Sequence, residues 1–204
     1  MSNKSLLKFI KGESVVLPSN GVGVFVGIEK KELFGGTVEV YRIFFEDENL
    51  DVFIPDDKLK DSGIRKVASK NIISKIFEIL AKTPKNNRGG IWNKKMEEYK
   101  AKIFSGSILL TTEVVRDGFS CTRDQNKSYT ERSYYKNALA RVTKEAAVVM
   151  GISYEEMENE ILDILKSTQN KKAQEDDFDD EFSEFENNGD KDENSIKDAK
   201  DDED

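Results

Sequence analysis

The chain has 204 residues, a formal net charge of −8, one cysteine and no histidine. A single cysteine cannot form a disulfide within the chain, and without histidine the sequence cannot build a Ser-His-Asp triad, a Cys-His nucleophile or a Cys/His zinc site. The N-terminal residues lack the apolar core of a signal peptide, and no later run approaches the ~18 apolar residues of a membrane span. We therefore expect a soluble cytoplasmic protein with no membrane association.

The charge is distributed over three unlike regions. Residues 1–67 carry 10 Lys/Arg against 11 Asp/Glu, and residues 68–172 carry 19 against 13. Residues 173–204 carry only 3 against 16, with few aliphatic side chains, so they cannot bury enough apolar surface to offset the entropy of ordering. We predict a disordered acidic tail over 168–204. Because the acidic total comes from this tail, the basic middle region remains suited to binding a polyanion.

The first region, residues 1–67, has the pattern of a small β domain. Segments rich in Val, Ile, Phe and Tyr alternate with turn-forming Gly, Asn and Asp, and they cover residues 14–18, 21–33, 37–46 and 50–55. Four or five short strands over about sixty residues are typical of a small curled sheet or barrel. We expect a β-barrel here.

From Ser69 onward the apolar residues recur with helical spacing, which predicts an all-α bundle over residues 68–167. About five helices are expected, beginning at Ser69, near Trp92, near Ser107, at Ser128 and at Ser153; the last two starts have the capping-box form S-x-x-E. The second, third and fourth helices are expected to end at Gly106, at "RDG" (116–118) and at Gly151. The predicted fold class is therefore α+β, with a β domain followed by helices and a tail.

The sequence shows no enzyme motif. "GVGVFVG" lacks the third glycine and the strand-to-helix turn of a dinucleotide fingerprint. Asp47, Glu48 and Asp51 cluster, but in a strand-rich unit such residues are more often solvated turn formers than an acid/base pair. We expect no enzyme, no cofactor, no metal and no small-molecule ligand; a carboxylate-dependent hydrolase would require a concave acid pair that the sequence does not display.

The most basic stretch surrounds the only tryptophan. Between Ser69 and Lys102 there are nine Lys/Arg against three Glu, and Trp92 lies between Arg88 and the pair Lys94 and Lys95. Cations and an aromatic ring at the start of a helix suit a phosphate-bearing partner. The alternative is that Trp92 begins a buried stripe with the three apolar residues that follow it at 4-3-4 spacing, Met96, Tyr99 and Ile103. Periodicity alone leaves both interpretations open.

The order of several motifs resembles the CarD/CdnL family of bacterial RNA-polymerase-binding transcription regulators. The matching segments are "GESVVLPSNGVGVFVGIE" (12–29), "DVFIP" (51–55), "GIRKV" (63–67), "WNKKMEEYKAKIFSGS" (92–107), "TEVVRD" (112–117) and "SYTERSYYKNALARVTKEAA" (128–147). Each motif is moderately specific, but their order and the β-then-α division cover residues 9–165.

The resemblance implies a Tudor-like domain (Tudor/SH3-like) over 1–67 that docks on the RNA polymerase β subunit. The helical domain, 68–167, would bind promoter DNA at the upstream edge of the transcription bubble without base-specific readout and so stabilise the open complex. By the same resemblance Trp92 would wedge into the minor groove, with Lys94, Lys95 and Arg132 contacting DNA; Arg88 joins them as the cation before Trp92.

The expected polymerase surface consists of Lys31 and the segment Leu50, Asp51, Val52, Phe53 and Ile54. Some relatives carry arginines on this surface; Lys31 replaces one of them, while the other position holds Phe53. An edge strand here would still pair through its backbone. We expect a monomer associated with the nucleoid. The alternative is a general DNA- or RNA-binding module with no polymerase contact.

Overall fold

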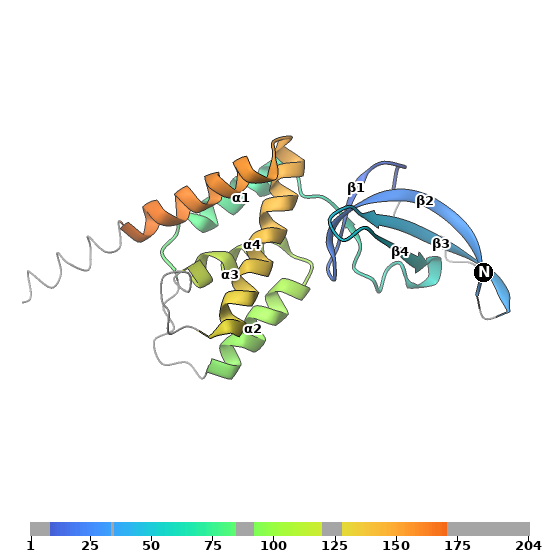
Figure 1. Ribbon diagram of the computed structural model, residues 1–204, viewed down its shortest axis with the longest axis horizontal. Helices are drawn as coiled ribbons and strands as arrows, with labels where there is room; N and C mark the ends of the chain where they lie inside the picture. Colours follow the sequence, from blue (N-terminus) through green and yellow to red (C-terminus); the bar gives the residue numbers. More distant parts are fainter. Residues whose placement is uncertain (1–8, 34, 85–91, 120–127, 171–204) are drawn as a thin grey trace, which may run out of the picture.

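The computed structural model describes residues 9–33, 35–84, 92–119 and 128–170, without the side chains of Leu33, Trp92 and Asn93. An antiparallel sheet occupies one half of the molecule and a helical bundle the other (Figure 1). The strands are β1 (Ser14–Leu17), β2 (Gly21–Leu33), β3 (Gly36–Phe45), β4 (Leu50–Pro55) and β5 (Arg65–Lys66). The α+β class with strands before helices is confirmed.

The sheet has the order β4-β3-β2-β1-β5, with every pair antiparallel. In the described part of the chain β4 and β5 lie at opposite edges and do not pair, so the expected barrel is not closed by hydrogen bonds. The reason is the short length of β5. It contains only two residues, both paired with β1, and so offers little backbone to a second neighbouring strand. A short 3-10 turn, Asp56–Lys58, follows β4.

One face of the sheet carries the core of the β domain. Its buried members are Val15, Leu17, Phe25, Tyr41, Ile43, Phe45, Ile54, Leu59 and Ile64. Strand β2 is irregular between Phe25 and Gly27, and Gly27 has a φ of 151°, which only glycine adopts readily. With this bulge, β2 pairs with β3 from Val24 to Leu33.

Gly23 lies where strand β2 passes closely over the core. A Cβ atom built there would lie 2.8 Å from Phe45 Cε1, 2.9 Å from Ile43 Cγ2 and 3.0 Å from a backbone oxygen. We expect Gly23→Ala to lower the free energy of unfolding by about 1–3 kcal/mol, because the packed core must shift. Urea unfolding measures the effect. Gly36→Ala, with no atom within 4 Å of its Cβ, is the matched control; equal stability of the two variants would contradict the prediction.

The helices are α1 (Lys70–Leu80), α2 (Trp92–Phe104), α3 (Ile108–Gly118), α4 (Tyr129–Met150) and a last helix described over 154–170. Ser69, Ser107 and Ser128 precede the first, third and fourth helices, as predicted. Gly151 ends α4 with a φ of 73° and donates to the carbonyl of Ala147 at 2.8 Å. The predicted starts and this end are therefore confirmed.

Helix α3 includes "RDG" (116–118) and ends at Gly118, within the segment where its end was expected. At Gly118 a Cβ atom would lie 3.2 Å from Tyr135 Cδ2. Glycine is thus used for close packing of α3 against α4 and not as a C-cap. Arg116 and Asp117, beside it, form an ion pair of 2.7 Å that is largely buried.

The helical core is a second cluster, formed by all five helices. From α2 it contains Met96, Tyr99 and Ile103, which confirms that these three predicted positions form a buried stripe. The side chain of Trp92 lies outside the described structure, so its place in that stripe stays open. No helix in the described ranges is long and apolar enough to cross a bilayer. The expected tail begins at 168, but the last helix is described through 170, and residues 171–204 lie outside the described residues.

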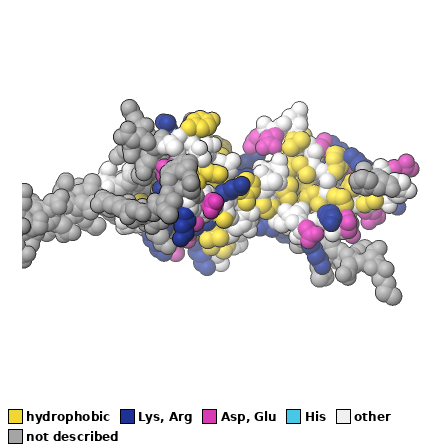
Figure 2. All heavy atoms as spheres, turned by 90° about the horizontal axis from the view of Figure 1, so that it is seen from below, with side chains coloured by type: hydrophobic (Ala, Val, Ile, Leu, Met, Phe, Trp, Pro, Cys, Tyr) yellow, Lys and Arg dark blue, Asp and Glu magenta, His cyan; other side chains and the backbone are white. Residues whose placement is uncertain are grey.

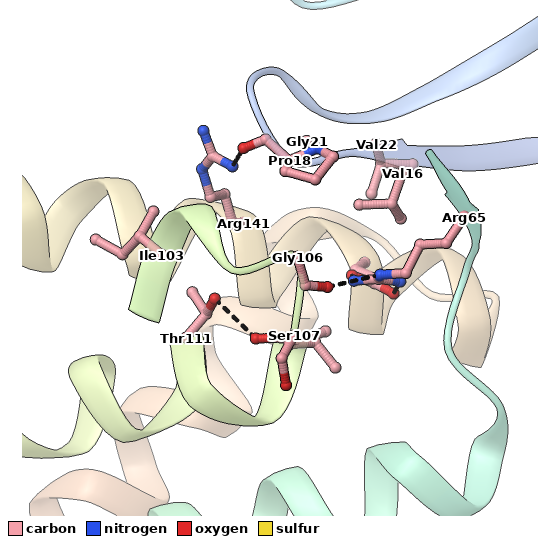
Figure 3. Close-up of a pocket in the computed structure, with 12 residues that line it drawn as sticks. Val16, Pro18, Gly21, Val22, Arg65, Ile103, Gly106, Ser107, Thr111 and Arg141 are labelled. Carbon is pink, nitrogen blue, oxygen red and sulfur yellow. Dashed lines mark hydrogen bonds and ion pairs between the residues drawn. The ribbon is translucent and has the colours of Figure 1, made fainter. Parts of the chain in front are cut away.

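The two halves of the molecule meet at a polar junction (Figure 3). Glu145 of α4 is buried and accepts hydrogen bonds from Arg65 Nη1 at 2.5 Å, Arg65 Nη2 at 2.9 Å and the Ala68 amide at 2.9 Å. Arg65 also donates through Nε to the carbonyl of Gly106 at 2.8 Å. One guanidinium therefore ties β5 both to α4 and to the turn before α3.

A second arginine ties α4 to the turn between β1 and β2. Arg141 donates to the carbonyl of Pro18 at 2.5 Å and to that of Ser19 at 2.8 Å. Burial lowers the pKa of this guanidinium. Lys144 forms a further ion pair with Asp47 across the junction. The cavity between these residues has a volume of about 20 Å³, which is room for one water molecule.

Candidate nucleic-acid interface and docking edge

Four of the five candidate DNA-binding residues, Trp92, Lys94, Lys95 and Arg132, belong to the first turns of α2 and α4, which lie together at one end of the helical domain (Figure 1). Lys95 Nζ donates to Glu131 Oε1 at 2.7 Å and so joins the two helix starts. Glu131 is buried, and its amide donates to the N-cap Ser128 Oγ at 3.2 Å. Residues 36 positions apart are thereby held side by side.

The predicted cations differ in their surroundings. Lys94 and Arg132 are exposed, one beside each end of the Lys95–Glu131 pair. The side chain of Lys95 is 26% exposed, and its Nζ also lies 5.3 Å from the centre of the Tyr99 ring. In this structure Lys95 is thus engaged within the protein, and its contact with DNA stays a prediction. Arg88 lies outside the described residues.

Two lysine substitutions separate a structural role from a DNA-binding role. We expect Lys94→Met to leave stability unchanged and to lower the slope of log K against log salt for duplex DNA by about 1, as one lost phosphate contact requires. Lys95→Met removes a partner from the buried Glu131, so we expect the free energy of unfolding to fall by about 1–3 kcal/mol. Salt titrations and urea unfolding measure the two effects. A Lys95→Met protein as stable as the wild type would contradict this assignment.

From below, Figure 2 shows Lys and Arg side chains spread over the helical half, while hydrophobic side chains gather over the junction and the β domain. Among the described residues no group of three or more His, Cys, Asp or Glu could hold a metal ion.

The predicted docking segment is strand β4, which forms an edge of the sheet. Leu50 and Phe53 are exposed, whereas Ile54 belongs to the core and can reach a partner only through its backbone. Lys31 Nζ lies 3.0 Å from the centre of the Phe53 ring, so two of the predicted docking residues lie together. Val40 is on β3, the strand between β2 and β4. The strand register places it on the same face of the sheet as Lys31 and Phe53, and it is fully buried.

A residue that the sequence did not single out, Arg42, organises this face. It donates through Nε and Nη2 to the two oxygens of Asp51, both at 2.8 Å, and through Nη1 to Glu29 at 3.2 Å. These hydrogen bonds lower the pKa of Asp51 and raise that of Arg42. Asp51 is thus a paired carboxylate. Register places Arg42 opposite Phe53, but nothing in the chain's spacing indicates this before the strands are paired.

Known families match both halves of this architecture. Residues 9–68 match the CarD-like/TRCF RID domain, and residues 75–174 match the C-terminal domain of CarD. An open five-stranded sheet followed by five helices, with these two matches in this order, makes the chain a CarD-like protein and a transcription regulator.

A curated relative agrees with this assignment. The chain is 27% identical over 148 residues to the protein named "Putative transcription factor YdeB" from Bacillus subtilis (strain 168). The match covers 72% of this chain and 96% of the relative, so both halves of the chain take part in it.

Proposed function

We propose that the protein binds the β subunit of RNA polymerase through the edge strand β4 and promoter DNA through the first turns of α2 and α4, and so stabilises the open complex. The observation that carries the proposal is that one domain has a sheet edge with unpaired backbone groups while the other has exposed cations. A polar junction joins the two domains. The family assignment supports the same division between the domains.

The docking step uses the backbone of β4. An edge strand presents unpaired N–H and C=O groups that a partner strand can extend, while exposed side chains select the partner. Leu50 and Phe53 supply apolar contact, and Lys31 adds a charge beside Phe53. The lysine and the ring together form a surface less basic than the two arginines of some relatives.

The DNA step uses differential binding. A protein that binds the melted promoter better than the closed duplex shifts the melting equilibrium by that difference in affinity. Lys94 and Arg132 would contact phosphates, which carry no sequence information, and Trp92 would insert at the edge of the bubble. Opening is favoured at any promoter that melts slowly, and escape is hindered where the open complex is already stable.

The lifetime of open complexes tests the proposal. Polymerase is bound to a promoter and challenged with heparin, with and without the full chain, and we expect the chain to lengthen the lifetime. Phe53→Ser should remove this effect and leave binding to free duplex DNA unchanged. Glu39→Ser, an exposed position on the neighbouring strand β3, is the control.

Two other outcomes of these experiments would count against the proposed function. An unchanged lifetime with the wild-type chain would overturn the proposal. Binding to DNA without any retention of polymerase would favour the second candidate, a general nucleic-acid-binding module, for which the exposed cations at the helix starts are the observation.

A further inference from the structure

Tyr129 opens helix α4 with its side chain in solvent. It is 82% exposed, more than any other large apolar side chain that the structure describes. Such exposure of an aromatic ring leaves a large apolar surface in water, so a partner that covers the ring would gain by burying it.

The chain contains a natural comparison for Tyr129. Ser153, Tyr154 and Glu156 begin the last helix with the same S-Y-x-E pattern. Tyr154 is only 43% exposed, its hydroxyl lies 3.4 Å from Glu158, and burial raises its pKa. The capping sequence therefore does not by itself force the tyrosine outward, and the exposure of Tyr129 belongs to its place in the fold.

The two capping boxes also use their glutamates differently. In the last helix Glu156 Oε2 accepts from the Ser153 amide at 2.9 Å, which completes the box. In α4 the carboxylate of Glu131 instead accepts from Lys95 of α2 at 2.7 Å. The start of α4 is thus attached to the start of α2, and Tyr129 is brought to the end of the domain where the predicted DNA contacts lie.

The neighbours of Tyr129 suit a phosphate-bearing partner. Arg132 follows it by three residues, which places both on one side of α4, and Arg132 is exposed. Lys94, also exposed, adjoins the lysine that holds the two helices together. An aromatic ring flanked by cations is the arrangement with which proteins bind unpaired nucleotides: the ring stacks on a base and the cations contact the backbone.

We propose that Tyr129 is a second aromatic contact to promoter DNA, stacking on an unpaired base at the edge of the bubble while Arg132 and Lys94 contact the adjoining phosphates. The inference rests on the proposed function and extends it from one aromatic residue to two. Because every base has a stackable face, the contact is tolerant of sequence. It is made only with melted DNA, so it adds to the differential binding that favours opening.

The test compares three full-length variants: Tyr129→Ala, Tyr129→Phe and, as matched control, Tyr154→Ala. Each is added to polymerase on a forked promoter that carries 2-aminopurine in the unpaired strand beside the fork. We expect Tyr129→Ala to shorten the lifetime of the open complex about 5-fold or more and to relieve the quenching of 2-aminopurine. Tyr129→Phe should retain both properties, because the ring and not the hydroxyl stacks.

The readouts separate the inference from the proposed function. If the wild-type chain lengthens the lifetime and Tyr129→Ala does so equally, the inference is overturned and the proposed function stands. If Tyr129→Ala shortens the lifetime but leaves the 2-aminopurine emission as in the wild type, the ring contacts protein, and the inference is again overturned. If the wild-type chain has no effect on the lifetime, the proposed function and the contact that rests on it both fail.

Discussion

Replacing Trp92 with alanine is expected to remove most of the stabilisation that we propose the protein gives to the open promoter complex. In the open complex the bases at the edge of the bubble are already unpaired, so a ring that stacks on them adds ~1–3 kcal/mol of stabilisation. Losing that stabilisation shortens the lifetime of the complex by about 5-fold to 150-fold. Trp92→Phe should fall between alanine and the wild type, because a smaller ring stacks less.

The free energy of unfolding of Trp92→Ala decides between the two roles of Trp92, as a buried side chain or as a contact to DNA. If its side chain completes the buried stripe of α2, Trp92→Ala should lower the free energy of unfolding by about 3–5 kcal/mol. A DNA-contacting side chain would leave stability nearly unchanged. Emission from this only tryptophan gives an independent reading: a blue maximum unmoved by polymerase and forked DNA indicates the core, and a solvent-like maximum quenched by both together indicates the DNA. Glu98→Ala, an exposed position on α2, is the control.

Replacing Glu145 with alanine is expected to lower the free energy of unfolding by about 2–4 kcal/mol. The substitution leaves the Ala68 amide and the Arg65 guanidinium without their carboxylate, and the side chain of Arg65 is only 30% exposed. Partial hydration of the arginine keeps the cost below that of a wholly buried pair. The loss should also uncouple the two halves of the molecule, since Glu145 receives bonds from β5 and from the segment before α1.

Hydrogen exchange measures both effects, because it reports the sheet and the helices separately. In the wild type we expect the slowest amides of the two halves to exchange with the same free energy; in Glu145→Ala the sheet should open at a lower free energy than the helices. Glu113→Ala is the matched control: its ion pair with Lys102 lies within the helical domain, and each partner is 27% exposed. We expect a change there of at most ~1 kcal/mol. Equal effects of the two substitutions would contradict a coupling role for Glu145.

The elements of the fold follow from local sequence signals. Serine N-caps before apolar periodicity predicted where α1, α3 and α4 begin, and Gly151 predicted where α4 ends. The end of α3 at Gly118 also lies within the predicted segment, but the close packing of this glycine against Tyr135 was not predictable from local sequence. Closure of the sheet was also not predictable. It depends on the length of β5 beside β1, and the residue pattern of a single strand does not indicate that length.

The candidate sites follow less completely, because their key contacts join residues far apart in the chain. Lys95 reads as a free cation until Glu131 is placed beside it, and Asp51 reads as a solvated turn residue until Arg42 pairs with it. Tyr129 belongs to no apolar stripe of the sequence. Its exposure could be anticipated only by comparing the two S-Y-x-E segments, whose local sequences are alike and whose surroundings are not.

The polar junction between the two domains affects how tightly each of the two proposed binding surfaces must bind its partner. With Arg65 and Arg141 fixing one domain on the other, the proposed binding of β4 to polymerase would set the position of the helical end and would raise the effective concentration of that end at the adjoining DNA. The second contact then costs little additional rotational freedom. On this proposal each surface could bind too weakly to persist alone, so the protein would not stay on bare DNA and would leave a promoter as soon as polymerase moves away.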